Sequence, residues 1–146
     1  MLDGVRVSAE NRLGGEGDGF KIAMGVLDAG RIGIASQAIG IARAAYEATL
    51  EYVKERKAFG AAIGTFQMTQ AKIADMAVEL GKAQLLALHL GKLKDDGKIK
   101  PEQVSFGKLN NVREALEIAR VSRTILGASG ITGEIMYVDG GFNTKI

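Results

Sequence analysis

Apolar residues recur at three- and four-residue steps over three long stretches of the chain, which predicts three amphipathic helices. The first is expected from about residue 20 to Lys57, where Phe59-Gly60 stops it, and either Asp18 or Gly19 serves as its N-cap. The residues expected on its inner face are Met24, Leu27, Arg31, Ile34, Ala35, Ala38, Ile39, Ala42, Tyr46, Leu50 and Val53.

The second predicted helix begins near Thr65, a hydroxyl N-cap candidate, and closes at Asp95-Asp96-Gly97. The third begins at Pro101, in the N1 position where a missing N–H costs nothing, and ends at Gly127. Their inner faces are expected to hold Ile73, Met76, Ala77, Leu80, Ala83, Ala87 and Leu90, then Val104, Val112, Ala115, Leu116, Ala119 and Ile125. Short links between long helices predict an all-α, up-down bundle of three to four helices.

The two ends of the chain have a different pattern from the helical part. Val5 and Val7 alternate with a polar residue, as at the end of a strand, and the glycine-rich loop before residue 20 separates them from the first helix. Residues 134–141 have strand composition and end in a turn, with only the Val5–Val7 segment as an evident partner. The predicted division is therefore 1–17, a helical domain over 18–131, and a tail over 132–146.

Composition excludes several classes of chemistry. The 146 residues include 20 Gly, one Pro, one His and no Cys, so disulfides, Cys-ligated zinc, iron–sulfur clusters and thiol nucleophiles are excluded. His89 alone builds no multi-histidine metal site and is given no role. A net charge of +2 with dispersed cations argues against nucleic acid. Uncharged runs such as residues 32–42 are shorter than the ~20 residues of a membrane span, so we expect a soluble, cytoplasmic protein.

Gly15, Gly17 and Gly19 precede a helix, and backbone N–H groups at such a position bind anions. The segment lacks the Lys-Ser/Thr of a P-loop, and no strand–helix–strand unit follows it. A plain linker is therefore the favoured interpretation, ahead of a phosphate cradle.

Arg31 lies among apolar residues in the middle of the first predicted helix. In one interpretation its stem covers the core while Asp28, three residues earlier, pairs with the guanidinium. In the other, Arg31 contacts an anion or carbonyl in a cleft, where Gly30 and Gly33 leave space beside it. Composition slightly favours the ion pair.

The cations of residues 54–57 lie at a helix C-terminus, where the helix dipole favours positive charge. Capping is one explanation for them. The other is a binding site, because Phe66 and Gln67 follow shortly afterwards. An arginine, an aromatic ring and an amide together suit a flat, phosphate-bearing heterocycle, with Arg on the pyrophosphate, the ring stacked and the amide on the edge.

An ordered series of motifs gives the chain a family resemblance. They are residues 14–21 (Gly-Gly-Glu-Gly-x-Gly-Phe-Lys), 27–35 (Leu-Asp-x-Gly-Arg-Ile-x-Ile-Ala), 55–60 (Glu-Arg-x-x-Phe-Gly), Phe66-Gln67 and 74–76 (Ala-Asp-Met). The series resembles the C-terminal helical domain of the flavin-dependent acyl-CoA dehydrogenases. The first half is similar to butyryl-type members and the second half to the glutaryl-CoA branch.

The resemblance implies an oxidoreductase that uses FAD to dehydrogenate acyl-CoA thioesters between the α and β carbons and passes electrons to an electron-transfer flavoprotein. It also implies a homo-oligomer, dimer or tetramer. Arg56, Phe59 and Gln67 would contact FAD, that of a neighbouring subunit, and Asp28 and Arg31 would line the acyl-CoA site. The flavin-contacting helix end would be Thr124, Ile125, Leu126, Gly127 and Ala128, although Thr124 replaces a usual Gln and Ala128 a usual Gly.

The resemblance also implies missing parts. Residues 1–17 would be the remnant of a preceding β-domain and its linker, and two further domains that supply flavin and substrate contacts lie outside this sequence. The family's catalytic Glu has no counterpart, and Gly30 occupies the alternative position for it. No catalytic residue is therefore assigned, and we expect the chain to be inactive alone. The alternative function is a helical oligomerisation module without chemistry.

Residues 130–143 carry a second resemblance, to the C-terminal strand of short-chain dehydrogenase/reductases of the enoyl reductase type. That family's glycine fingerprint is absent, and no Tyr is followed four positions later by Lys. The tail is interpreted as a borrowed fragment, native, fused or artificial.

Overall fold

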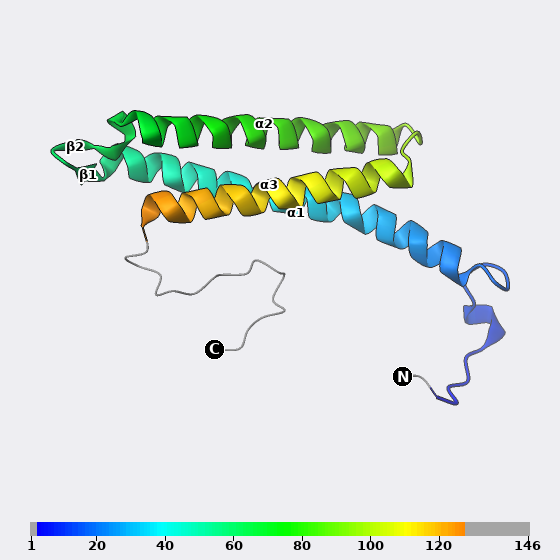
Figure 1. Cartoon of the computed structure of the whole chain (residues 1–146). Helices are drawn as coiled ribbons and strands as arrows, with labels where there is room; N and C mark the ends of the chain where they lie inside the picture. Colours follow the sequence, from blue (N-terminus) through cyan, green and yellow to red (C-terminus); the bar gives the residue numbers. More distant parts are fainter. Residues whose placement is uncertain (1–2, 128–146) are drawn as a thin grey trace.

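The computed structural model describes residues 3–127, which form three long helices lying side by side (Figure 1). They are α1 (Gly19–Glu55), α2 (Gln67–Asp95) and α3 (Pro101–Leu126). The short elements are the 3₁₀ turns η1 (Ala9–Asn11) and η2 (Ile63–Thr65), and the strands β1 (Lys57–Ala58) and β2 (Ala61–Ala62). The chain reverses direction at each link, so the predicted all-α up-down bundle is confirmed.

The ends of α3 and the end of α2 follow their local signals. Pro101 is the first residue of α3, and the backbone N–H of Lys100 donates to Gln103 Oε1 at 2.9 Å. Gly127 follows the last turn with φ +75°, a conformation that glycine adopts without strain. These termini are confirmed, as is the end of α2 at Asp95.

Two other termini differ in detail from the prediction. The first helix, expected to reach about Lys57, ends at Glu55, because Lys57 leaves the helix to pair with Ala62 in a two-stranded hairpin. Thr65 does not cap α2. Its hydroxyl donates backward to the carbonyl of Ala62, the N-cap of η2, at 2.7 Å, and Phe66 occupies the N-cap position of α2.

The core lies where the three helices meet. Its buried apolar residues are Ala35, Ala38, Ile39, Ala42, Val53, Met76, Leu80, Ala83, Leu90, Val104, Ala115 and Ile118. Most of them lie on the predicted inner faces. In α3 the inner face is rotated from the prediction, so that Val112 and Leu116 are exposed while Ile118 is buried.

Polar residues take part in this core. Thr49 and Asn111 are fully buried, and Ser122 is nearly so. The hydroxyls of Thr49 and Ser122 both donate to the carbonyl of Ala45, at 2.7 and 3.3 Å. Asn111 Nδ2 donates to the carbonyl of Ala83 at 3.3 Å and so joins α3 to α2. Each buried polar group thus has a hydrogen-bond partner, as burial requires.

The segment Val5–Val7, compatible with a strand end, pairs with no other segment between residues 3 and 127, and both valines are exposed. Its expected partner lies in the tail, so the pairing stays a prediction. The predicted strand in residues 134–141, and the tail as a whole, lie outside the described residues.

The first turns of α1 extend beyond α2 and α3 (Figure 1). No residue of α1 before Ala35 is buried. By length and composition alone, α1 is apolar enough to cross a membrane. An 18-residue window within it has a mean hydropathy of 1.2, and 17% of this window is buried in the structure. A helix that packs within a bundle passes the same test, and α1 supplies six buried residues to this one.

Candidate functional site

The hairpin between α1 and α2 presents an aromatic side chain in an unusual backbone conformation. Phe59 has φ +53° and Gly60 has φ +82°, the pair of left-handed residues typical of a type I′ turn. The Phe59 side chain is 99% exposed, and its ring meets that of Phe66 edge-on with centroids 6.4 Å apart. A bulky residue with this φ is strained by about 1 kcal/mol or more, and such strain is concentrated at functional sites.

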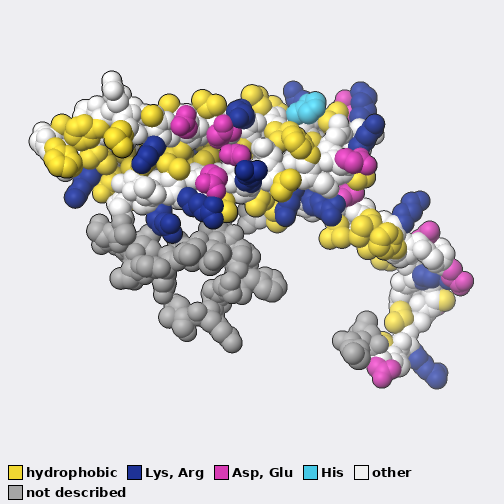
Figure 2. Space-filling view, in the orientation of Figure 1, with side chains coloured by type: hydrophobic (Ala, Val, Ile, Leu, Met, Phe, Trp, Pro, Cys, Tyr) yellow, Lys and Arg dark blue, Asp and Glu magenta, His cyan; other side chains and the backbone are white. Residues whose placement is uncertain are grey.

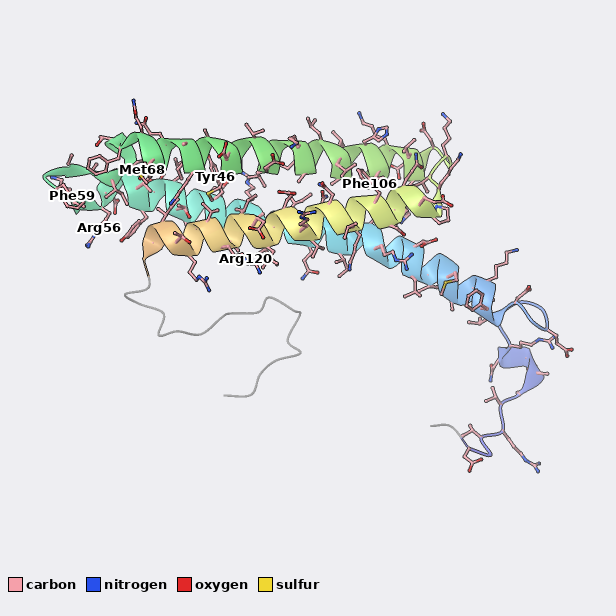
Figure 3. All side chains as sticks on the ribbon, viewed as in Figure 1. Tyr46, Arg56, Phe59, Met68, Phe106 and Arg120 are labelled. Atoms are coloured by element: carbon pink, nitrogen blue, oxygen red, sulfur yellow. The ribbon has the colours of Figure 1, made fainter. Side chains whose placement is uncertain are left out.

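Arg56 lies at the base of the same hairpin. Its N–H donates to the carbonyl of Tyr52 and its carbonyl accepts from the N–H of Ile63, both at 2.8 Å. The backbone is therefore fixed, while the side chain is exposed and makes no ion pair with any residue in the described part of the chain. In Figure 3, Arg56 and Phe59 project from the same end of the bundle.

Gln67 is the first residue of α2 and its side chain is exposed. It follows Phe66, whose ring contacts Phe59. The structure therefore brings Arg56, Phe59 and Gln67 together around one hairpin. A guanidinium, an aromatic ring and an amide, all open to solvent, fit the phosphates and the flat ring system of a dinucleotide such as FAD.

The C-terminal end of α3 lies at the same end of the bundle as this hairpin (Figure 1). Thr124 is exposed and its hydroxyl donates to the carbonyl of Arg120 at 2.9 Å. Ile125 packs against the core, Leu126 is half-buried, and Gly127 is exposed. Ala128 lies outside the described residues.

Asp28 and Arg31 form an ion pair on α1, with Asp28 Oδ1 and Arg31 Nη1 2.6 Å apart and both side chains half-buried. This is the arrangement that the local interpretation of Arg31 predicts. Arg31 precedes Arg56 by 25 positions, which is about 38 Å along a helix. A single chain therefore does not bring the predicted acyl-CoA residues next to the predicted FAD residues.

A cleft of about 530 Å³ opens between α1 and α2 next to the hairpin. Its apolar lining includes Tyr46, Leu50, Val53, Ala62, Ile73, Ala74 and Ala77. The hydrophobic pattern did not indicate this cleft, because the same spacing places Tyr46, Leu50 and Ala77 on the inner faces of a closed core. The alanines on the α2 side of the cleft are the sequence feature that could have predicted it, since small side chains leave a hollow between the two helices.

The other sequence features have local structural roles. In the glycine-rich loop, the N–H of Gly15 donates to Asp18 Oδ2 at 2.9 Å, so one donor of the supposed anion cradle is already used by the loop itself. His89 is exposed on α2. Over residues 3–127, no three His, Cys, Asp or Glu side chains gather in a way that could hold a metal ion.

The structure defines an up-down bundle of three long helices with an exposed aromatic hairpin and an arginine at one end (Figure 3). The sequence matches the model of the acyl-CoA dehydrogenase C-terminal domain over residues 17–139. The chain therefore belongs to the acyl-CoA dehydrogenase family, as the motif series predicts.

Relatives from both predicted branches resemble the chain. It is 42% identical over 135 residues to the mitochondrial short-chain specific acyl-CoA dehydrogenase of the mouse. These residues make up 92% of the chain and 33% of the relative. The butyryl-CoA dehydrogenase of Megasphaera elsdenii has a TM-score of 0.83 and 40% identity, covering 86% of the chain and 33% of that structure. A glutaryl-CoA dehydrogenase of Mycobacterium smegmatis in complex with FADH2 has a TM-score of 0.75 and 50% identity. The similarity covers 80% of the chain and 30% of that structure. The chain thus spans about a third of the length of these relatives.

Proposed function

We propose that the chain is the helical part of an FAD-dependent acyl-CoA dehydrogenase-type oxidoreductase. The match to the family's C-terminal domain over residues 17–139 carries this proposal. The M. smegmatis relative is described with FADH2, the reduced form of the proposed cofactor. FAD, when bound, accepts the hydride that leaves the β-carbon of the acyl-CoA thioester. An electron-transfer flavoprotein is the proposed electron acceptor, and the cytoplasm the proposed location.

In this proposal each end of the bundle serves a different site. The end formed by Arg56, Phe59 and Gln67 binds the phosphates and rings of one FAD, together with the end of α3. The end that carries Asp28 and Arg31 lines an acyl-CoA site. The separation of about 38 Å along α1 supports a division of each site between neighbouring subunits of a homo-oligomer.

The structure also bears on the source of the catalytic base. Asp28 is engaged with Arg31 at 2.6 Å, so its carboxylate is oriented toward the guanidinium on the same helix. At Gly30, an added Cβ would meet no atom within 4 Å, so the backbone leaves room for a side chain that this sequence lacks. We propose that the base is supplied from outside residues 3–127, and that the chain alone does not dehydrogenate.

Flavin binding by the full 146-residue chain tests the proposal. We expect FAD to bind with its visible spectrum perturbed, and Arg56→Ala to weaken binding by about 10- to 100-fold, the worth of one charge-assisted hydrogen bond. Lys98→Ala, at the other end of the bundle and also exposed, is the matched control and is expected to change nothing. Equal affinities for the Arg56→Ala and Lys98→Ala variants would contradict the assignment of Arg56.

A helical oligomerisation module without chemistry is the second candidate. The long exposed apolar surfaces of α1 and α2 favour it. A chain that assembles yet binds neither FAD nor an acyl-CoA thioester, in equilibrium dialysis with each, would support the module and contradict the oxidoreductase proposal.

A further inference from the structure

The η2 turn connects the hairpin to α2 and is held from both helices. On the α1 side, the N–H of Ile63 donates to the carbonyl of Arg56 at 2.8 Å. At Gly64 an added Cβ would lie 3.0 Å from the carbonyl oxygen of Val53, so the backbones of η2 and α1 are in close contact. On the α2 side, Gln70 donates from Nε2 to the carbonyl of Gly64 at 3.0 Å. Gln70, which the motif series does not include, is therefore bonded to the turn beside the proposed flavin site.

The hydrogen bond from Gln70 has no backbone equivalent. Between residues 3 and 127, none of the backbone hydrogen bonds of turns and loops uses the carbonyl of Gly64. The backbone bond at this end of η2, from the N–H of Phe66 to the carbonyl of Ile63, is long at 3.2 Å. An exposed carbonyl that loses its partner bonds to water instead. Removal of the Gln70 amide is therefore expected to loosen the turn without unfolding the bundle.

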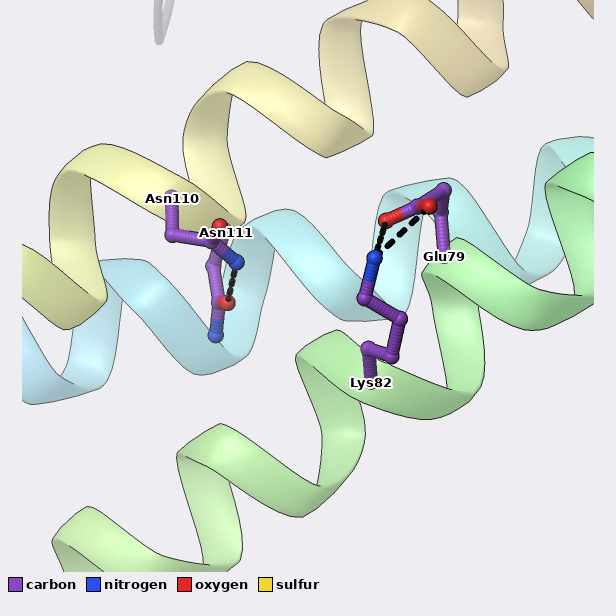
Figure 4. A network of polar contacts seen from close by, with 4 residues as sticks. All are labelled: Glu79, Lys82, Asn110 and Asn111. Carbon is purple, nitrogen blue, oxygen red and sulfur yellow. Dashed lines mark hydrogen bonds and ion pairs between the residues drawn. The ribbon is translucent and has the colours of Figure 1, made fainter.

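Gln70 differs in this respect from other polar side chains on the helices. In the network of Figure 4, Lys82 bonds to Glu79 on α2, and Asn110 bonds to Asn111 on α3. Each of these side-chain pairs lies within one helix. The bond from Gln70 instead spans six positions and joins α2 to the separate element η2. It is a connection between elements rather than a local contact.

The bond from Gln70 bears on the geometry of the proposed flavin-binding group. The backbone bends at Phe66, which has the extended angles φ −84° and ψ 131° between η2 and α2. Gln67 follows this bend as the first residue of α2 and lies three positions before Gln70. Because the bond from Gln70 spans the bend, it fixes the first turn of α2, and Gln67 with it, relative to η2. The turn is itself bonded to Arg56, so the spacing between the Gln67 amide and the guanidinium depends on this bond.

We propose that Gln70 is a positioning residue for flavin binding, which holds the Gln67 amide at a fixed distance from the guanidinium of Arg56. Binding groups are effective when the residues around them hold their geometry in advance. In this proposal Gln70 does not contact FAD, because its amide is bonded to Gly64. The inference rests on the proposed function for the roles of Arg56 and Gln67. Figure 2 shows hydrophobic side chains next to Lys or Arg side chains on the surface at this end of the bundle.

Titration of the full chain with FAD, followed by flavin fluorescence, tests the role of Gln70. We expect Gln70→Met, which keeps the side-chain length but removes the donor, to weaken FAD binding about three- to tenfold, the worth of one hydrogen bond. Gln84→Met, at an exposed glutamine further along α2, is the matched control and should leave the affinity unchanged. Gln70→Lys retains a donor and should bind FAD as tightly as Gln84→Lys. Equal affinities for Gln70→Met and Gln84→Met would overturn the proposal.

A double-variant cycle separates positioning from a direct contact with FAD. If Gln70 acts through Gln67, the spacing that it holds no longer matters once the Gln67 amide is removed. The loss caused by Gln70→Met is therefore expected to fall below about twofold in the Gln67→Ala background. An undiminished loss in that background would show that Gln70 acts on FAD by itself, and would contradict a positioning role.

Amide hydrogen exchange of the chain without FAD makes the test independent of the proposed function. The N–H of Ile63 should exchange about three- to tenfold faster in Gln70→Met than in Gln84→Met, because the η2 turn opens more often. Circular dichroism should be the same for both variants. Unchanged exchange at Ile63 would overturn the inference even if FAD binds. Failure of the unsubstituted chain to bind FAD would overturn the proposed function and with it the flavin role of Gln70, but not its hold on η2.

Discussion

Gly107 shows how one missing side chain fixes the contact between α3 and α2. A Cβ at this position would overlap with Cδ1 of Leu90, which is only 2% exposed, so the Leu90 side chain would have to shift within the core. Most other helical glycines differ, since around Gly40 an added Cβ would meet nothing within 4 Å. The packing of α3 against α2 therefore favours glycine at position 107, while no contact favours it at position 40.

Exchanging each of these glycines for alanine is expected to have opposite effects. Gly107→Ala should lower the free energy of unfolding by about 1–3 kcal/mol, because Leu90 is forced out of its packed position. Gly40→Ala should raise it by about 0.5–1 kcal/mol, because alanine is the better helix former. Urea unfolding followed by circular dichroism measures both, and a gain in stability for Gly107→Ala would show that Leu90 relaxes easily.

Asn111 is the residue whose role the hydrophobic pattern did not indicate. It lies on the inner face of α3 and is fully buried, with one hydrogen bond to the carbonyl of Ala83 and another from the side chain of Asn110 at 3.1 Å. A buried amide that bonds to one particular carbonyl of a neighbouring helix favours a single register between α3 and α2.

Among the elements, the β1–β2 hairpin is the one that its own sequence favours least. It interrupts the path from α1 to α2 and holds Phe59 in the left-handed region, where asparagine or glycine is favoured. Only two residue pairs form its ladder. The exposed position of the ring shows that core packing does not explain the choice of phenylalanine.

Replacing the strained residue is expected to stabilise the chain. Phe59→Asn should raise the free energy of unfolding by about 0.5–1 kcal/mol, because Asn-Gly is the preferred pair in a type I′ turn. It should also weaken FAD binding, if the ring contacts the cofactor as proposed. Ala58→Asn, at the neighbouring strand position with ordinary backbone, is the control and should give no gain. Thermal unfolding with and without FAD distinguishes the two effects, and a loss of stability in Phe59→Asn would show that the turn is not strained.

On the scale of the whole molecule, the long α1 separates two functional ends. Its first turns extend beyond the bundle (Figure 1), Asp28 and Arg31 come before its first buried residue, Ala35, and the hairpin with Arg56 lies at the other end (Figure 3). Exposed apolar residues such as Phe20, Leu27 and Ile34 occur in this part of α1, before Ala35.

The separation makes the two ends independent in a single chain. Arg31→Ala is expected to leave FAD affinity within about twofold of the original, because about 38 Å of helix lies between this residue and the hairpin and far exceeds the ~8–10 Å range of screened charges. Binding of an acyl-CoA thioester should weaken by at least about tenfold through loss of a charged contact. Calorimetric titration with each ligand checks this, and a parallel loss of FAD binding would mean that the ends are coupled.

Local signals in the sequence were sufficient for the helices. The three- and four-residue spacing, Pro101 at the start of α3 and Gly127 at its end act within one or two turns, so the sequence alone placed these features correctly. The N-cap prediction at Thr65 was wrong because a competing local hydrogen bond decides there: the hydroxyl bonds backward to the carbonyl of Ala62, three residues earlier. The pairing of Val5–Val7 with the tail stays a prediction, since no partner strand occurs among the described residues.

For the candidate site, the sequence by itself determined the residue types and the family, because the motifs that carry them are contiguous. It predicted Arg56, Phe59 and Gln67 as one group and the ion pair of Asp28 with Arg31 as one interpretation. Only the tertiary structure decided that the first group lies around one exposed hairpin, that the ion pair lies far from it along a rigid helix, and that a cleft opens beside the alanines of α2. Distances between elements depend on how helices of fixed length pack against one another, and that packing is not encoded in any single segment.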